Sequence, residues 1–173
     1  MTLLPKAILL VAVLGLAACN NPDRYGAGGV DPNATAGAGI DTTGLGDPNN
    51  PNSVAYFNQT IGDRVLFAVD QSNLSDSARN VLAGQARWMT SNPDYAVIIE
   101  GHADEQGTRE YNLALGARRA SAVQNYLISQ GVSAARLRTV SYGKERPLEV
   151  CSVEACYSQN RRAVTVLSVG AGT

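Results

Sequence analysis

Apolar residues gather in short runs over the second two thirds of the chain, and each run predicts an element of one domain. Residues 65–69 (VLFAV) form a short apolar run that predicts a buried strand. Residues 95–100 (YAVIIE) are apolar until the last position, as expected of a strand covered on both faces. Two further strands are predicted at residues 137–142 and 163–169.

Two helices are predicted between these strands. The first follows Ser75, a suitable N-cap, and ends before Asn92-Pro93. Its apolar residues recur at helical spacing, at Val81, Leu82, Ala86 and Met89. The second is capped by Thr108 and runs to about residue 130, where Gly131 suits a left-handed C-terminal position. The order β-α-β-α-β-β predicts an α/β (α+β) sandwich with two main helices on one face of a small mixed sheet.

Residues 1–18 at the N-terminus are predicted to be a targeting segment. Lys6 precedes an apolar run from Ala7 to Ala18, which as a helix would extend about 18 Å. Because the hydrocarbon core of a membrane is about 30 Å thick, the run predicts a secretory signal rather than a membrane span. Cys19 follows small residues, as in the bacterial lipobox, where the cysteine thiol accepts lipid. The alternative is an ordinary signal peptide with a chance cysteine.

A polar segment follows. Residues 19–53 are rich in Gly, Pro, Asn and Thr with few bulky apolar residues, so they predict a disordered tether. Such a chain has a root-mean-square span of roughly 30–35 Å. Asn20 stands where an aspartate would signal retention at the inner membrane, which favours the outer membrane. Residues 54–173 are predicted to form the domain, with residues 54–61 docking onto it.

Charge and ligand counts exclude several classes of function. The chain has 14 Lys and Arg residues against 15 Asp and Glu residues, so it lacks the excess of positive charge that is typical of nucleic-acid-binding proteins. One histidine, His102, and three cysteines do not suit a structural zinc site, and no metal or cofactor is predicted. His102 is interpreted as a packed, hydrogen-bonded residue rather than an acid or base.

The loop between residues 101 and 107 and the helix after it carry the candidate binding residues. On a helical wheel one stripe is predicted to face the sheet, formed by Leu113, Ala117, Ala120 and Leu127. Asn112 and Arg119 flank this stripe on one rim, about 10 Å apart along the axis. A loop carboxylate, Asp104, can fold back towards Arg119, and the two opposite charges suggest a receptor for a zwitterion. The alternative is a structural salt bridge between Asp104 and Arg119 without a ligand.

Residues 101–127 (GHADEQGTREYNLALGARRASAVQNYL) resemble the OmpA-like peptidoglycan-binding domain family, whose helix pattern is N-x2-L-[SG]-x2-RA-x2-V-x3-L. The matching positions are Asn112, Leu115, Gly116, Arg119, Ala120, Val123 and Leu127. The resemblance continues through residues 140–147 and 159–164 and covers about residues 64–169. Two departures occur: Phe67-Ala68-Val69-Asp70 replaces F-x-F-D, and Arg109 stands where a proline is common.

The resemblance implies a ligand, meso-diaminopimelate in uncrosslinked stem peptides of peptidoglycan. Asp104 would bind its ammonium and Arg119 its carboxylate, while Asn112 and Leu115 shape the pocket. Phe67 and Asp70 would form the opposite wall, and Arg161 would add support or an anion contact. The lipoproteins of this family also imply a second partner, the periplasmic β-propeller protein of the Tol system, and a role in envelope constriction at division.

The predicted function is therefore a non-catalytic, lipid-anchored link between outer membrane and cell wall. A wall-acting amidase or peptidase is the alternative from another class, but it would need a metal or an activated nucleophile. A scaffold that has lost its ligand is a third possibility. Cys151 and Cys156 are predicted to form a disulfide, because disulfides persist in exported proteins, with two free thiols as the alternative.

Overall fold

The structure is a computed structural model that describes residues 46–169. The predicted signal segment, the lipidation site Cys19 and most of the tether lie outside the described residues. In the described range no helix is both long enough and apolar enough to cross a membrane.

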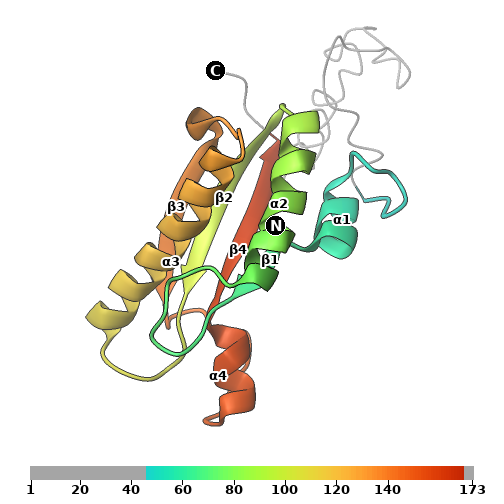
Figure 1. Cartoon of the computed structure of the whole chain (residues 1–173). Helices are drawn as coiled ribbons and strands as arrows, with labels where there is room; N and C mark the ends of the chain where they lie inside the picture. The colour runs from blue at the N-terminus through green and yellow to red at the C-terminus, as the bar shows by residue number, and fades with distance from the viewer. Residues whose placement is uncertain (1–45, 170–173) are drawn as a thin grey trace, which may run out of the picture. The chain divides into compact units, whose positions relative to one another are not determined.

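A four-stranded sheet forms the back of the domain (Figure 1). Its strands are β1 (Arg64–Leu66), β2 (Tyr95–His102), β3 (Leu137–Gly143) and β4 (Arg162–Val169), in the spatial order β1-β4-β2-β3. β2 and β3 run parallel, whereas β4 is antiparallel to both of its neighbours. The predicted small mixed sheet is confirmed.

Two long helices, α2 (Asp76–Ser91) and α3 (Arg109–Ser129), cover one face of this sheet (Figure 1). Both begin where the sequence predicts. The Ser75 hydroxyl accepts a hydrogen bond from the Ala78 amide at 3.2 Å, and Thr108 accepts one from the Tyr111 amide at the same distance. Each cap satisfies an amide that has no partner inside its helix.

The predicted order lacks a fourth helix, α4 (Glu154–Asn160), which projects beyond the end of the sheet (Figure 1). It has only seven residues and buries only Asn160, so it shows no apolar stripe in the sequence. Three short helical segments complete the fold: α1 (Val54–Tyr56), η3 (Phe57–Gly62) and η4 (Ala134–Arg136).

The first strand is shorter and more exposed than predicted. Only Val65 and Leu66 of this run join the sheet, in a strand that begins at Arg64, and Leu66 and Val69 are 43% and 54% exposed. β1 is an edge strand paired with β4 alone, so its residues alternate between core and solvent. In β2 buried residues alternate with half-buried ones, so the prediction that both faces are fully covered is also wrong.

The buried stripe of α3 is rotated from the predicted one. Ala117 is exposed and Leu113 is only half-buried. The residues that face the sheet are Asn112, Leu115, Gly116, Arg119, Ala120, Val123 and Leu127. The rotation follows from a close crossing, because a Cβ added to Gly101 of β2 would overlap the backbone carbonyl of Gly116. Asn112 and Arg119, predicted on the rim, therefore lie within the buried face.

The segment before β1 packs onto the domain, as predicted for residues 54–61. Phe57 is fully buried and its ring lies 5.0 Å from that of Trp88. The Trp88 indole donates to the Pro51 carbonyl at 2.7 Å, and Ser53 is also fully buried. The packed chain thus begins upstream of residue 54, inside the last part of the segment predicted as a tether.

Candidate functional site

A cavity of about 230 Å³ opens where the loops after β1 and β2 meet the first turns of α3. Its lining residues come from three separate stretches of sequence: Val69, Asp70, Asp104, Gln106, Gly107, Tyr111, Asn112 and Leu115. Of the seven predicted ligand residues, it brings together Asp70, Asp104, Asn112 and Leu115. The other three, Phe67, Arg119 and Arg161, do not line it.

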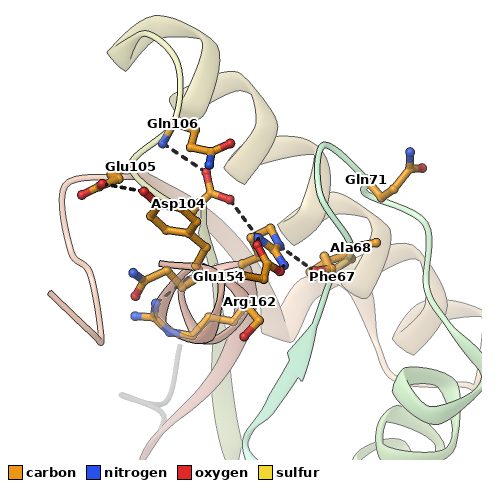
Figure 2. Close-up of polar contacts among 12 residues, drawn as sticks. Phe67, Ala68, Gln71, Asp104, Glu105, Gln106, Glu154 and Arg162 are labelled. Atoms are coloured by element: carbon orange, nitrogen blue, oxygen red, sulfur yellow. Dashed lines mark hydrogen bonds and ion pairs between the residues drawn. The ribbon is translucent and has the colours of Figure 1, made fainter. Parts of the chain in front are cut away.

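Asp104 is held firmly in the loop after β2 (Figure 2). It is 8% exposed, and its Oδ1 accepts a hydrogen bond from the Gln106 amide at 3.2 Å. Its Oδ2 lies 3.2 Å from Nη1 of Arg161. The side-chain amide of Asn112 donates to the Gln106 backbone carbonyl at 2.7 Å and fixes the far side of the same loop. The carboxylate on the cavity wall therefore has little freedom to move.

Arg119 is a support behind the cavity rather than a residue on its rim. It is fully buried and donates to three backbone carbonyls, those of Gln71 at 2.8 Å, His102 at 2.8 Å and Ala68 at 3.2 Å. These bonds tie the loop after β1 to the end of β2. In the described part of the chain the ion-pair partner of Asp104 is Arg161, so the alternative of an Asp104–Arg119 salt bridge is wrong.

Burial also changes the chemistry of Arg119. Loss of solvent lowers the pKa of its guanidinium to about 10, while the nearby Asp104 carboxylate acts in the opposite direction and raises it. A group with that pKa remains charged at neutral pH. The site therefore has a fixed positive charge behind a wall that carries carboxylates.

The two predicted residues of the opposite wall have separate roles. Asp70 lines the cavity in a left-handed backbone conformation, with φ of 57°, and its carboxylate accepts a hydrogen bond from the Tyr111 hydroxyl. Phe67 is buried, and its ring centre lies 5.2 Å from the guanidinium carbon of Arg119. Sequence reasoning missed Tyr111, although it directly precedes Asn112 in the first turn of the helix.

Arg161 links the cavity wall to α4. Its Nε donates to the Phe67 carbonyl at 3.2 Å, and its guanidinium contacts both Asp104 and Glu154. Only 5% of its side chain is exposed. The hydrogen bond to Glu154 is the main reason that the pKa of Arg161 is raised, so this arginine is permanently charged.

His102 is packed, as predicted, but the predicted hydrogen bonds are wrong. The side chain is 2% exposed, and neither ring nitrogen has a hydrogen-bond partner among the described residues. Burial, with the charges of Arg162 and Arg146, lowers the pKa of His102 to about 4, although Nε2 lies 3.5 Å from a Glu100 carboxylate oxygen. The ring is neutral at pH 7 and lies outside the cavity lining.

A disulfide joins Cys151 to Cys156 beside this site, with 5.8 Å between their Cα atoms. Across residues 46–169, no three side chains of His, Cys, Asp or Glu are grouped closely enough to hold a metal ion.

Comparisons with known proteins agree with this architecture. The profile of the OmpA family matches residues 66–161. A peptidoglycan-associated lipoprotein from Mesorhizobium japonicum is 49% identical over 169 residues, which cover 98% of this chain and 94% of that protein. A protein of the same name from Pseudomonas aeruginosa is 45% identical over 137 residues, covering 78% of this chain and 76% of that one.

Solved structures show the same fold. The crystal structure of the peptidoglycan-associated lipoprotein from Burkholderia pseudomallei superposes with a TM-score of 0.63 at 40% identity, covering 70% of this chain and all of that one. The relatives are named for an association with peptidoglycan, and together with the match to the OmpA family they confirm the prediction of a protein that is not an enzyme. The chain belongs to the OmpA family and, within it, to the peptidoglycan-associated lipoproteins.

Proposed function

We propose that this protein binds peptidoglycan non-covalently through the 230 Å³ cavity, which takes the meso-diaminopimelate side chain of uncrosslinked stem peptides. The observation that carries the proposal is Asp104, a carboxylate that is only 8% exposed yet lies on the cavity wall. Asp70 adds a second carboxylate, and no described lysine or arginine lines the cavity. A wall of this charge favours an ammonium group.

Arg119 is proposed to act on the other charge of the ligand. Its guanidinium has five N–H groups, and backbone carbonyls accept from three of its nitrogens. Its charge, held behind the cavity, would attract the ligand carboxylate through space, together with backbone amides at the N-terminus of α3. Its three backbone bonds would also keep the two cavity loops in place.

The setting of this site in the cell envelope is part of the same proposal. Lipid on Cys19 would hold the chain in the outer membrane, and the polar segment after it would let the domain reach the wall. From its membership of the peptidoglycan-associated lipoproteins, we propose that the protein also works with the β-propeller protein of the Tol system in envelope integrity and division.

Co-sedimentation with purified cell-wall sacculi tests the site. Asp104→Asn keeps the size of the side chain and removes its charge, so we expect binding at least about tenfold weaker than that of the wild type. Glu110→Gln is the matched control, because Glu110 is an exposed acid in the first turn of α3 and does not line the cavity. Wild-type sedimentation by Asp104→Asn would show that the receptor is assigned to the wrong residues.

Arg119 is less suitable for this test. Its replacement by alanine would remove three hydrogen bonds to backbone carbonyls and leave these acceptors buried. A loss of binding in such a variant would report on the fold and on the ligand together. Asp104→Asn keeps most of the local contacts and therefore separates the two effects.

A further inference from the structure

The segment closed by the Cys151–Cys156 disulfide reaches the binding loop by two routes, one through Arg161 to Asp104 and one directly to Glu105. Glu154 binds the guanidinium of Arg161, which in turn contacts Asp104. Ser152 donates a hydrogen bond to the carboxylate of Glu105 at 2.6 Å. Both contacts join α4 and its approach to a loop that lies about fifty residues earlier in the chain.

The contact between Glu154 and Arg161 sets how much of the positive charge of Arg161 acts on Asp104. Arg161 is buried between the two carboxylates of Asp104 and Glu154, whereas Glu154 itself is 66% exposed. The hydrogen bond from Arg161 is also the main cause that lowers the pKa of Glu154, so this carboxylate is ionised at neutral pH. Because Glu154 shares the positive charge of Arg161, Asp104 keeps negative charge with which to attract an ammonium group.

The second contact fixes the position of the loop. Glu105 follows Asp104 directly and accepts hydrogen bonds from Ser152 and from the Tyr157 hydroxyl, the latter at 2.9 Å (Figure 2). The Lys144 ammonium donates to the Glu105 carbonyl at 3.3 Å and to the Gly107 carbonyl at 2.7 Å. The backbone on the C-terminal side of Asp104 is therefore held by side chains from outside the loop.

The disulfide keeps the residues that make these contacts in place. α4 has seven residues, begins without a side-chain cap at Val153 and buries only Asn160. A helix this short is not stable by itself, so its conformation depends on tertiary contacts. Asn160 supplies one anchor by accepting from the Leu148 and Glu149 amides at 2.7 and 3.0 Å, and the disulfide supplies the other.

We propose that the disulfide-closed segment 151–156 positions the Asp104 carboxylate for ligand binding, with Glu154 and Ser152 as its two contacts. The inference rests on the proposed function, because the ammonium of diaminopimelate is the group that Asp104 would receive. Glu154 is thus a positioning residue that acts through Arg161.

Calorimetric titration of the full mature chain with the tripeptide L-Ala–D-Glu–meso-diaminopimelate tests the inference. We expect Glu154→Gln to bind on the order of fivefold more weakly, in the range of a close coupled contact. Glu154→Asp should recover most of the affinity, because it restores the charge. A double Cys151→Ser, Cys156→Ser variant should also lose several-fold in affinity, whereas Glu110→Gln should match the wild type.

The outcomes separate the proposed function from the positioning role of segment 151–156. A wild type that does not bind the tripeptide would overturn the proposed function, and this inference with it. If the wild type binds, then unchanged affinity in either Glu154→Gln or the double cysteine variant would overturn the positioning role alone. Glu154→Asp binding as weakly as Glu154→Gln would show that charge at this position is not the cause. Thermal melts of every variant identify any that is unfolded.

Discussion

His102 is a buried ring at the point where the binding loop leaves β2, and among residues 46–169 neither of its nitrogens has a hydrogen-bond partner. Its neighbours are a carboxylate at 3.5 Å, Glu100, and two arginines whose charges oppose protonation, Arg146 and Arg162. The Tyr142 ring lies 5.6 Å from it. Since neither ring nitrogen is satisfied by the described residues, the ring serves as a packing group in its neutral form.

This burial predicts a pH dependence of stability. The pKa of His102 is about 4 in the folded chain and about 6.5 in an unfolded one, so between these values the unfolded state binds more protons. Stability should therefore decrease as the pH falls from 6.5 to 4, by up to about 3 kcal/mol. Urea unfolding at intervals between pH 7 and pH 4.5 measures it.

His102→Gln is the control for this prediction. His102 is the only histidine in the chain, and the lowered pKa values of Glu105 and Glu154 lie below the ordinary value of 4.5. The stability that those two carboxylates provide is present above pH 4.5, and it is lost as the pH falls through their folded pKa values. That loss lies below most of the pH range of the unfolding experiment. An equal slope in wild type and His102→Gln would contradict the assignment.

At the residue scale the sequence predicts which residues come together better than it predicts how deeply each one is buried. Asp104 and Asn112 follow from their place after a strand and at a helix start, and both line the cavity. The burial of Arg119 could not be predicted from helical periodicity, because an arginine counts as polar on a wheel. Three backbone carbonyls that come from distant loops satisfy it, and no local pattern reveals them.

At the scale of elements, the crossing of α3 over β2 sets the geometry of the site. Gly101 and Gly116 meet there with no room for a side chain on either, and the Ser141 hydroxyl of β3 donates to the Leu113 carbonyl of α3 at 2.6 Å. This close approach places the first turns of α3 against the end of β2. The cavity is formed where the helix and the loop after the strand diverge again.

Gly101→Ala should therefore be strongly destabilising. The added Cβ meets backbone atoms of Gly116, which cannot move aside as a flexible side chain would, and we expect a loss of about 3 kcal/mol or more. Gly46→Ala is the control, because a Cβ there meets nothing within 4 Å. Thermal and urea unfolding measure both. A melting temperature of Gly101→Ala close to that of the control would disprove the tight crossing.

The elements that sequence reasoning predicts are those with an apolar run or a side-chain cap at the start of a helix. α2, α3 and β2 each have one, and their starts are found within a residue or two. α4 has none, because a seven-residue helix that buries one asparagine relies on a disulfide and on side-chain contacts for its conformation. The rotation of α3 is not predicted for a related reason. A glycine contributes nothing to an apolar pattern, yet Gly116 makes the closest contact between α3 and β2.

At the scale of the whole molecule, we propose different physical tasks for the folded domain and the N-terminal segment. The chain has a formal charge of −1, so it gains little from an anionic membrane surface. We propose that lipid on Cys19 supplies the hold on the outer membrane. Two or more acyl chains are sufficient for stable anchoring, whereas one is not.

Cys19→Ala should therefore release the protein from the membrane, though not from the wall. We expect the variant to leave the membrane fraction but to sediment with intact sacculi, because Asp104 and the cavity are unchanged. Combining Cys19→Ala with Asp104→Asn should leave the protein soluble in the periplasm, since both attachments are then lost. Fractionation with and without digestion of the wall separates the two attachments. If Cys19→Ala stays in the membrane fraction after the wall is digested, a second membrane contact exists and lipid is not the anchor.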